Sequence, residues 1–156
     1  MTRRFYVLLG AVSLAVAGAI AAVLVLVLGG GGDGEPTRAE YVAKVNAVCR
    51  GYNAKLSRIP APIAVGNPAA IALSIGQALP LVEERAARAG AIEPPRELEG
   101  RVGRMFALSG QAIRELRAAR RAALAGRLRE SALALGRFLA VSDEAHQVGL
   151  GLGLRC

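Results

Sequence analysis

Hydrophobic and polar residues divide the chain into one long apolar segment and four later segments with a helical period. Residues Phe5–Leu28 carry no charged side chain, and as a helix they would extend about 36 Å. A bilayer's hydrocarbon core is roughly 30 Å thick. Because Arg3 and Arg4 precede the segment and Asp33 and Glu35 follow it, the positive-inside rule places the N-terminus in the cytoplasm. The pattern predicts a transmembrane signal-anchor helix with everything after it outside the cytoplasm.

A cleaved signal peptide is the competing interpretation of this segment. The apolar region of a signal peptide usually spans about 7–15 residues and precedes small residues. Ala15-Val16-Ala17 has suitable side chains but is followed by more apolar residues, and Gly29–Gly32 is a poor cleavage site. Both interpretations export the rest of the chain, and the length favours a retained anchor. A glycine-rich tether of about 15 Å would then hold the exported domain close to the membrane.

Four segments after this tether repeat apolar residues every three or four positions, as amphipathic helices do. Thr37 and Glu40 form a capping box, Asn67-Pro68 is a helix start, and Gly126 is a stop signal. Short connections favour antiparallel neighbours, so we expect an all-α fold in which an up-down four-helix bundle follows a single N-terminal transmembrane helix. The expected parts are a cytoplasmic N-terminus at 1–4, the transmembrane helix at 5–28, the tether at 29–36 and a bundle at 37–156, with helices at about 38–59, 68–89, 96–125 and 127–149.

The chain has two cysteines, Cys49 and Cys156. An even number of cysteines in an exported chain favours a disulfide. Cys49 lies on the apolar stripe of the first helix, about 18 Å from its start, and the residues after Gly149 can reach back about 23 Å. We therefore favour an internal, structural bridge. The alternative is a buried free Cys49 with Cys156 paired between chains.

Four short motifs are spread over the exported domain. The first helix contains Tyr41–Arg50, and Ile59–Pro62 follows it. Pro94–Leu98 lies in the centre, and the chain ends with Gly151–Cys156. These motifs resemble a large uncharacterised family of small exported proteins in high-GC actinobacteria. The resemblance implies a helical exported domain with the two cysteines paired, and it brings no activity.

The chain is basic, with a formal net charge of +8 at pH 7 that arginine supplies almost alone. Arg114, Arg117 and Arg121 fall on the face of the third helix opposite its apolar stripe. Such a patch would suit anionic lipid headgroups or wall polymers, although a solvated outer face is the simpler interpretation. Nucleic acid is not an expected partner, because the domain is exported and lacks a recognised binding motif.

Residues that could carry catalysis or bind a metal are scattered. His146, the one histidine, lacks the spacings of haem-attachment and di-iron motifs. Met105 and His146 could together ligate haem, but a methionine on an apolar stripe usually packs. Ser109, Ser131 and Ser142 have no paired base in the sequence. No cofactor or metal is expected.

A catalytic pair of carboxylates is not indicated either. Glu83 and Glu84 alternate with Arg85 and Arg88, which is typical of a solvated helix face. The sequence therefore favours a non-enzymatic interaction or structural module at the cell envelope. A second hypothesis is a carrier or sensor that binds a small apolar ligand in its core, motivated by small residues and by Pro80 inside the second helix. An enzyme would need a cleft that holds the histidine with a carboxylate or serine.

Overall fold

The computed structural model describes residues 35–60 and 66–156. Within them the chain forms four α-helices and one short 3-10 helix, without strands, so the all-α prediction is confirmed there. None of the described helices is both long and apolar enough to cross a membrane. The transmembrane helix predicted at 5–28 lies outside the described residues. The elements are α2 (Arg38–Leu56), α3 (Pro68–Gly90), η1 (Arg96–Leu98), α4 (Glu99–Leu124) and α5 (Leu128–Leu152).

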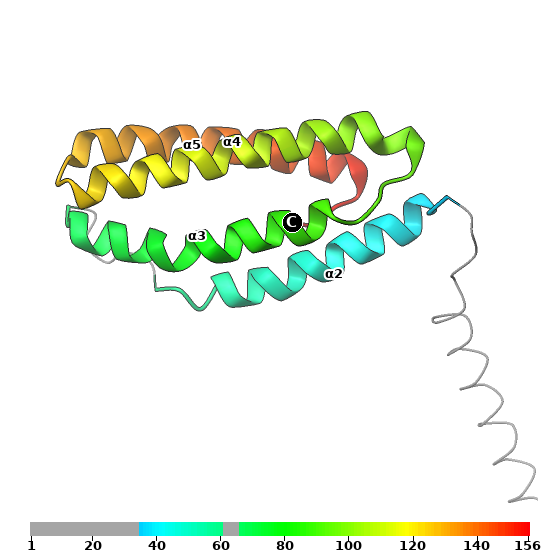
Figure 1. Cartoon of the computed structure of the whole chain (residues 1–156), viewed down its shortest axis with the longest axis horizontal. Helices are drawn as coiled ribbons and strands as arrows, with labels where there is room; N and C mark the ends of the chain where they lie inside the picture. Colours follow the sequence, from blue (N-terminus) through cyan, green and yellow to red (C-terminus); the bar gives the residue numbers. More distant parts are fainter. Residues whose placement is uncertain (1–34, 61–65) are drawn as a thin grey trace, which may run out of the picture. The chain divides into compact units, whose positions relative to one another are not determined.

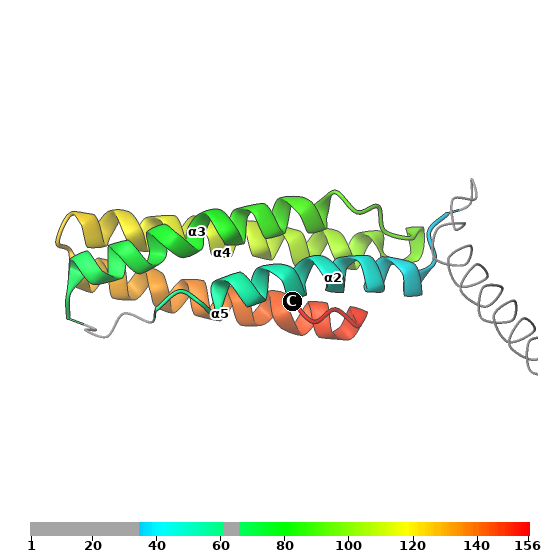
Figure 2. The same cartoon turned by 90° about the horizontal axis from the view of Figure 1, so that it is seen from below.

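All of these helices belong to one unit, Pro36–Cys156, and successive helices run in opposite directions (Figures 1 and 2). Helix α4 packs most extensively on α5 and also on α3, while α3 packs on α2. At 19 residues α2 is shorter than α4, which has 26. As Figure 1 shows, α2 covers only one end of the bundle, so α3, α4 and α5 build the other end.

Local signals set the starts of α2 and α3. Thr37 and Glu40 form the expected capping box, in which the Thr37 N–H donates to the Glu40 carboxylate at 2.9 Å. The side chain of Asn67 accepts from two backbone N–H groups after Pro68, which occupies the first turn. Pro80 is exposed inside α3. The helix continues through it, although proline has no backbone N–H to donate.

Three helix boundaries differ from the sequence prediction. Helix α2 ends at Leu56 rather than near Ile59, because the following residues form a tight turn. The third predicted helix begins as the separate 3-10 turn η1 before α4. Helix α5 continues to Leu152 rather than ending at Gly149, because Leu152 is fully buried and extends the apolar face of the helix.

Glycines in the left-handed region end α4 and α5. Gly126 has φ 70°, and the N–H of Arg127 reaches back to the carbonyl of Ala122 at 2.9 Å. Gly153 has φ 91°, and the N–H of Leu154 likewise reaches the carbonyl of Gly149 at 2.9 Å. Both are Schellman motifs, which satisfy the last carbonyls and reverse the chain. The second one directs the C-terminal tail back along the bundle toward α2 (Figure 1).

Two separate clusters of buried side chains form the core. The first lies where all four helices meet and also includes the C-terminal tail. It consists of Tyr41, Val45, Cys49, Ala89, Leu98, Val102, Met105, Leu152 and Leu154. The second holds α3, α4 and α5 together at the other end. It consists of Ile71, Ala72, Ile75, Leu116, Ala119, Ala123 and Ala134.

Candidate functional site

A cleft of about 450 Å³ lies between the two core clusters. Along α3, α4 and α5, the stretches that line it fall between the residues of the first cluster and those of the second. The C-terminal tail and Cys49 of α2 complete its wall. Small-molecule sites commonly measure about 300–1,000 Å³, so the cleft is large enough for a ligand.

Small side chains account for this space. Ala86, Ser109, Ala112 and Gly149 line the cleft from three different helices, and none of them is long enough to fill it. Val82 and Ala86 belong to the apolar stripe of α3, which predicts core positions, yet both are only half-buried. Helix α2 does lie beside this part of α3, since Asn53 accepts from Arg85 there, so the half-burial follows from the small side chains around the cleft.

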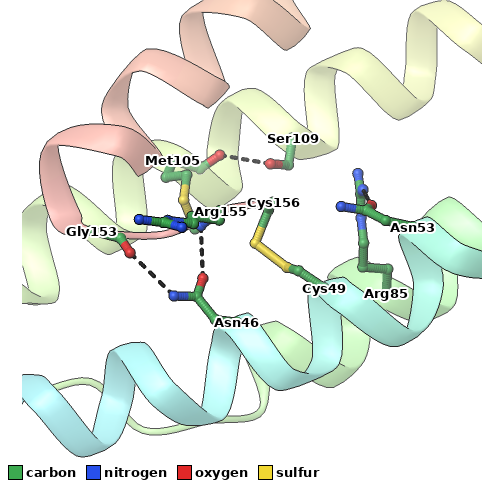
Figure 3. The surroundings of a disulfide bond; sticks show 9 residues. All are labelled: Asn46, Cys49, Asn53, Arg85, Met105, Ser109, Gly153, Arg155 and Cys156. Carbon is green, nitrogen blue, oxygen red and sulfur yellow. Dashed lines mark hydrogen bonds between the residues drawn. A yellow bond between two sulfur atoms is a disulfide. The ribbon is translucent and has the colours of Figure 1, made fainter.

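The disulfide between Cys49 and Cys156 forms one end of the cleft wall, which confirms the predicted pairing (Figure 3). The two Cα atoms lie 5.0 Å apart at a sequence separation of 107. Cys49 is buried in the first core cluster. The bridge thus fixes the last residue of the chain against α2, and with it this end of the cleft.

Asn46 also holds the C-terminal tail. Its side-chain amide donates to the Gly153 carbonyl at 3.2 Å and accepts from the Arg155 N–H at 2.7 Å (Figure 3). These bonds satisfy backbone groups that the end of α5 leaves free. In the sequence pattern, Asn46 lies outside the apolar stripe of the first helix, and the pattern does not indicate its contact with the tail. The missed signal is its position three residues before Cys49, which puts the amide on the side of α2 that the tail meets.

The cleft brings together several side chains that the sequence treats separately. Ser142, Asp143 and His146 of α5 line it, as do Met105 and Ser109 of α4. Asp143 and His146 are exposed, and neither makes a hydrogen bond or ion pair with the described residues. The Ser109 hydroxyl donates to the Met105 carbonyl at 2.9 Å. The cleft therefore offers polar groups at its surface without a hydrogen-bonded nucleophile and base.

One other sequence candidate, Ser131, does not line the cleft. Ser131 is fully buried and donates to the Ala119 carbonyl at 3.1 Å, which joins α5 to α4. The role of Ser131 is therefore to stabilise the contact between two helices.

Within residues 35–60 and 66–156, no group of three or more His, Cys, Asp or Glu side chains is arranged to hold a metal ion.

Arg85 was predicted on a solvated helix face, but the structure half-buries it in the cleft wall. Its Nη1 donates to the Asn53 Oδ1 at 3.0 Å, and burial lowers the pKa of its guanidinium. It makes no ion pair with any described carboxylate, whereas Arg88 pairs with Glu84 at 2.8 Å on the exposed side of α3. The signal that could have revealed it is Asn53, a polar residue one helical turn after Cys49 on the same face of α2.

The three arginines of the predicted surface patch are all exposed on α4. Arg117 pairs with Glu83 of α3 at 2.9 Å, so one charge of the patch is already compensated. Arg121 lies beside Arg127 at a second, smaller cavity between α4 and α5. Arg114 makes no ion pair with the described residues. A contact of Arg114, Arg117 and Arg121 with an anionic surface stays a prediction.

The cleft thus brings together several candidate functional side chains of the described part of the chain. It joins apolar walls to one partly buried cation on α3 and exposed polar groups on α5. No protein-family model, curated protein or solved structure matches the chain. The resemblance to exported actinobacterial proteins therefore stays a prediction, and the cleft is the feature of the described residues that bears on function.

Proposed function

We propose that this protein is a membrane-anchored, extracytoplasmic helical bundle that binds a small, mainly apolar molecule between its two core clusters. The cleft of about 450 Å³ is the observation that carries this proposal. The sequence alone favoured an interaction or structural module without a ligand over a carrier or sensor. The cleft favours the carrier or sensor, because a module that only presents its outer surface has no need of an unfilled core.

The apolar side chains around the cleft support an apolar ligand. Phe106, Ile113 and Phe138 line the cleft and are only half-buried, while Leu139 at its edge is 64% exposed. A ligand that covered these side chains would contribute roughly 25 cal/mol for each Å² of apolar surface removed from water. The free cleft therefore leaves apolar surface exposed that a bound hydrocarbon would remove from water.

Two features support the proposed compartment. The uncharged segment Phe5–Leu28 has the length and flanking charges of a single-pass anchor with a cytoplasmic N-terminus. Disulfides persist mainly in oxidising compartments, and Cys49–Cys156 is such a bond. Because Ser109 donates to a backbone carbonyl and His146 has no described hydrogen-bond partner, we propose binding rather than catalysis.

Photolabelling of the full chain in phosphatidylcholine nanodiscs tests ligand binding. The probe is dodecanol with a diazirine in its alkyl chain, and mass spectrometry locates the labelled residues. We expect labelling at cleft residues such as Met105 and Phe138. Ala86→Phe, which adds a ring on the cleft wall, should reduce this labelling about tenfold, a difference of roughly 1.4 kcal/mol in binding.

The matched control is Ala87→Phe, which adds the same ring at the neighbouring, exposed position of α3. It should leave cleft labelling within about twofold of the original chain. Labelling that avoids the cleft, or that is equal in Ala86→Phe and Ala87→Phe, would reject the proposal.

A further inference from the structure

Arg85 is the one arginine among the residues that line the cleft. Figure 3 shows its guanidinium beside Asn53, near the disulfide. Its hydrogen bond to Asn53, at 3.0 Å, is the only one it makes with the described residues. A guanidinium carries several N–H donors in a planar fork, so most of them remain available to a further acceptor.

The neighbouring arginines have carboxylate partners where Arg85 has an amide. Arg88 pairs with Glu84 at 2.8 Å within α3, and Arg117 pairs with Glu83 at 2.9 Å across to α3. Both pairs lie in solvent, where an ion pair contributes little. Arg85 is the more buried cation, and it lacks a described ion-pair partner. A partly desolvated charge without a counter-ion raises the free energy of the folded state, and an anion bound beside it would offset that cost.

The other charges of the cleft limit which anion fits. Asp143 and His146 line the opposite, α5 side and are exposed to solvent. A doubly charged phosphate would meet one guanidinium, the neutral amide of Asn53 and the negative charge of Asp143, so its charge would exceed the one positive charge beside it. A single carboxylate matches the one guanidinium, and its two oxygens suit the planar fork. The balance of charge favours a monocarboxylate.

We propose that the ligand of the cleft is a single-chain amphiphile whose one carboxylate binds Arg85 and whose hydrocarbon chain lies along Phe106, Ile113 and Phe138. The inference rests on the proposed function, and it adds the chemical class of the ligand and the residue that recognises its head group. Arg85 occupies the α3 wall, while the three apolar side chains belong to α4 and α5, so head and chain contact different helices.

Four photoreactive probes with the same alkyl chain test this assignment in the full chain, again in phosphatidylcholine nanodiscs. They are dodecanoate, dodecanol, dodecyl phosphate and dodecyltrimethylammonium. Each is titrated against the original chain and against Arg85→Met, which keeps a long side chain and removes the charge. We expect Arg85→Met to raise the concentration of dodecanoate needed for half-maximal cleft labelling about tenfold or more. The dodecanol titration should stay within about twofold, which also shows that the variant is folded.

The matched control is Arg88→Met, which removes an exposed charge from the next turn of α3 and should leave every titration unchanged. If dodecanoate and dodecanol respond alike to Arg85→Met, the head-group assignment is overturned while the apolar cleft stands. If dodecyl phosphate depends on Arg85 more strongly than dodecanoate, the monocarboxylate assignment is wrong. If dodecyltrimethylammonium labels the cleft and Asp143→Asn abolishes this labelling, the cleft recognises a cationic head group and the monocarboxylate assignment is also wrong. If no probe labels the cleft, the proposed function itself fails.

Discussion

Reduction of the Cys49–Cys156 bridge should lower the free energy of unfolding of the bundle by about 4–5 kcal/mol. The bond joins positions separated by 107 residues, and the magnitude follows from the entropy that a loop of this length loses in the unfolded chain. Native contacts of the tail survive reduction, because Leu152 and Leu154 are buried and Asn46 binds the tail backbone. The reduced bundle should therefore keep its fold with less stability.

Urea denaturation of the full chain in nanodiscs, followed by far-ultraviolet circular dichroism, measures this change with and without a reductant. For a slope of about 1–3 kcal/mol per molar urea, the midpoint should fall by about 1–5 M. The control is Cys156→Ser, whose midpoint should not respond to the reductant. It should equal the midpoint of the reduced original chain within error.

A fall of less than about 1 kcal/mol would refute the loop-entropy reasoning, since the loop term alone is several times larger. It would show that the unfolded chain stays compact without the bridge, or that the bond opposes native packing. Alkylation of Cys49 in unreduced protein would contradict the bridge itself. Cys49 is only 1% exposed, so this reaction is to be measured after unfolding.

Two further outcomes are expected. Gly153→Ala should destabilise the bundle by about 1–2 kcal/mol, because φ 91° strains any residue with a Cβ, whereas Gly136→Ala in the open interior of α5 should stabilise it by about 0.5–1 kcal/mol. Thermal unfolding measures both, and equal shifts would contradict the role of Gly153 in the chain reversal. An impermeant amine reagent should label Lys44 and Lys55, the only lysines and both exposed, in intact cells. Labelling that requires cell lysis would contradict the extracytoplasmic placement of the bundle.

Local signals in the sequence were sufficient for the helical elements, for the starts of α2 and α3 and for the end of α4. Thr37, Asn67 and Gly126 act through hydrogen bonds and dihedral angles within a few residues of themselves, so their effects can be read without knowing the fold. The predicted end of α5 was wrong because a local signal does not include contacts with distant parts of the chain. Gly149 has the residue type of a stop, yet burial of Leu152 in the distant first core cluster carries the helix further.

The disulfide could be predicted in part from the sequence. Cysteine number and an export segment predict a bond, and a helical register places Cys49 on an apolar face. How the tail returns to it depended on the Schellman turn at Gly153 and on the amide of Asn46. The Asn46 bonds join residues more than 100 positions apart, so spacing could not identify them. The turn at Gly153 is local and gives the chain reversal, but not the helix that the tail then meets.

The sequence by itself determined the helices and an apolar N-terminal segment long enough for a membrane anchor, and it favoured the pairing of the two cysteines. Only the tertiary structure decided that the core is divided, that a cleft of about 450 Å³ separates its halves, and that Arg85 lies in the wall of that cleft. The physical reason is that helical periodicity gives the face on which a residue lies. It does not give the side chains that neighbouring helices contribute beside that face. Small residues of α4 and α5 line the cleft together with Val82 and Ala86 of α3, so both stay only half-buried.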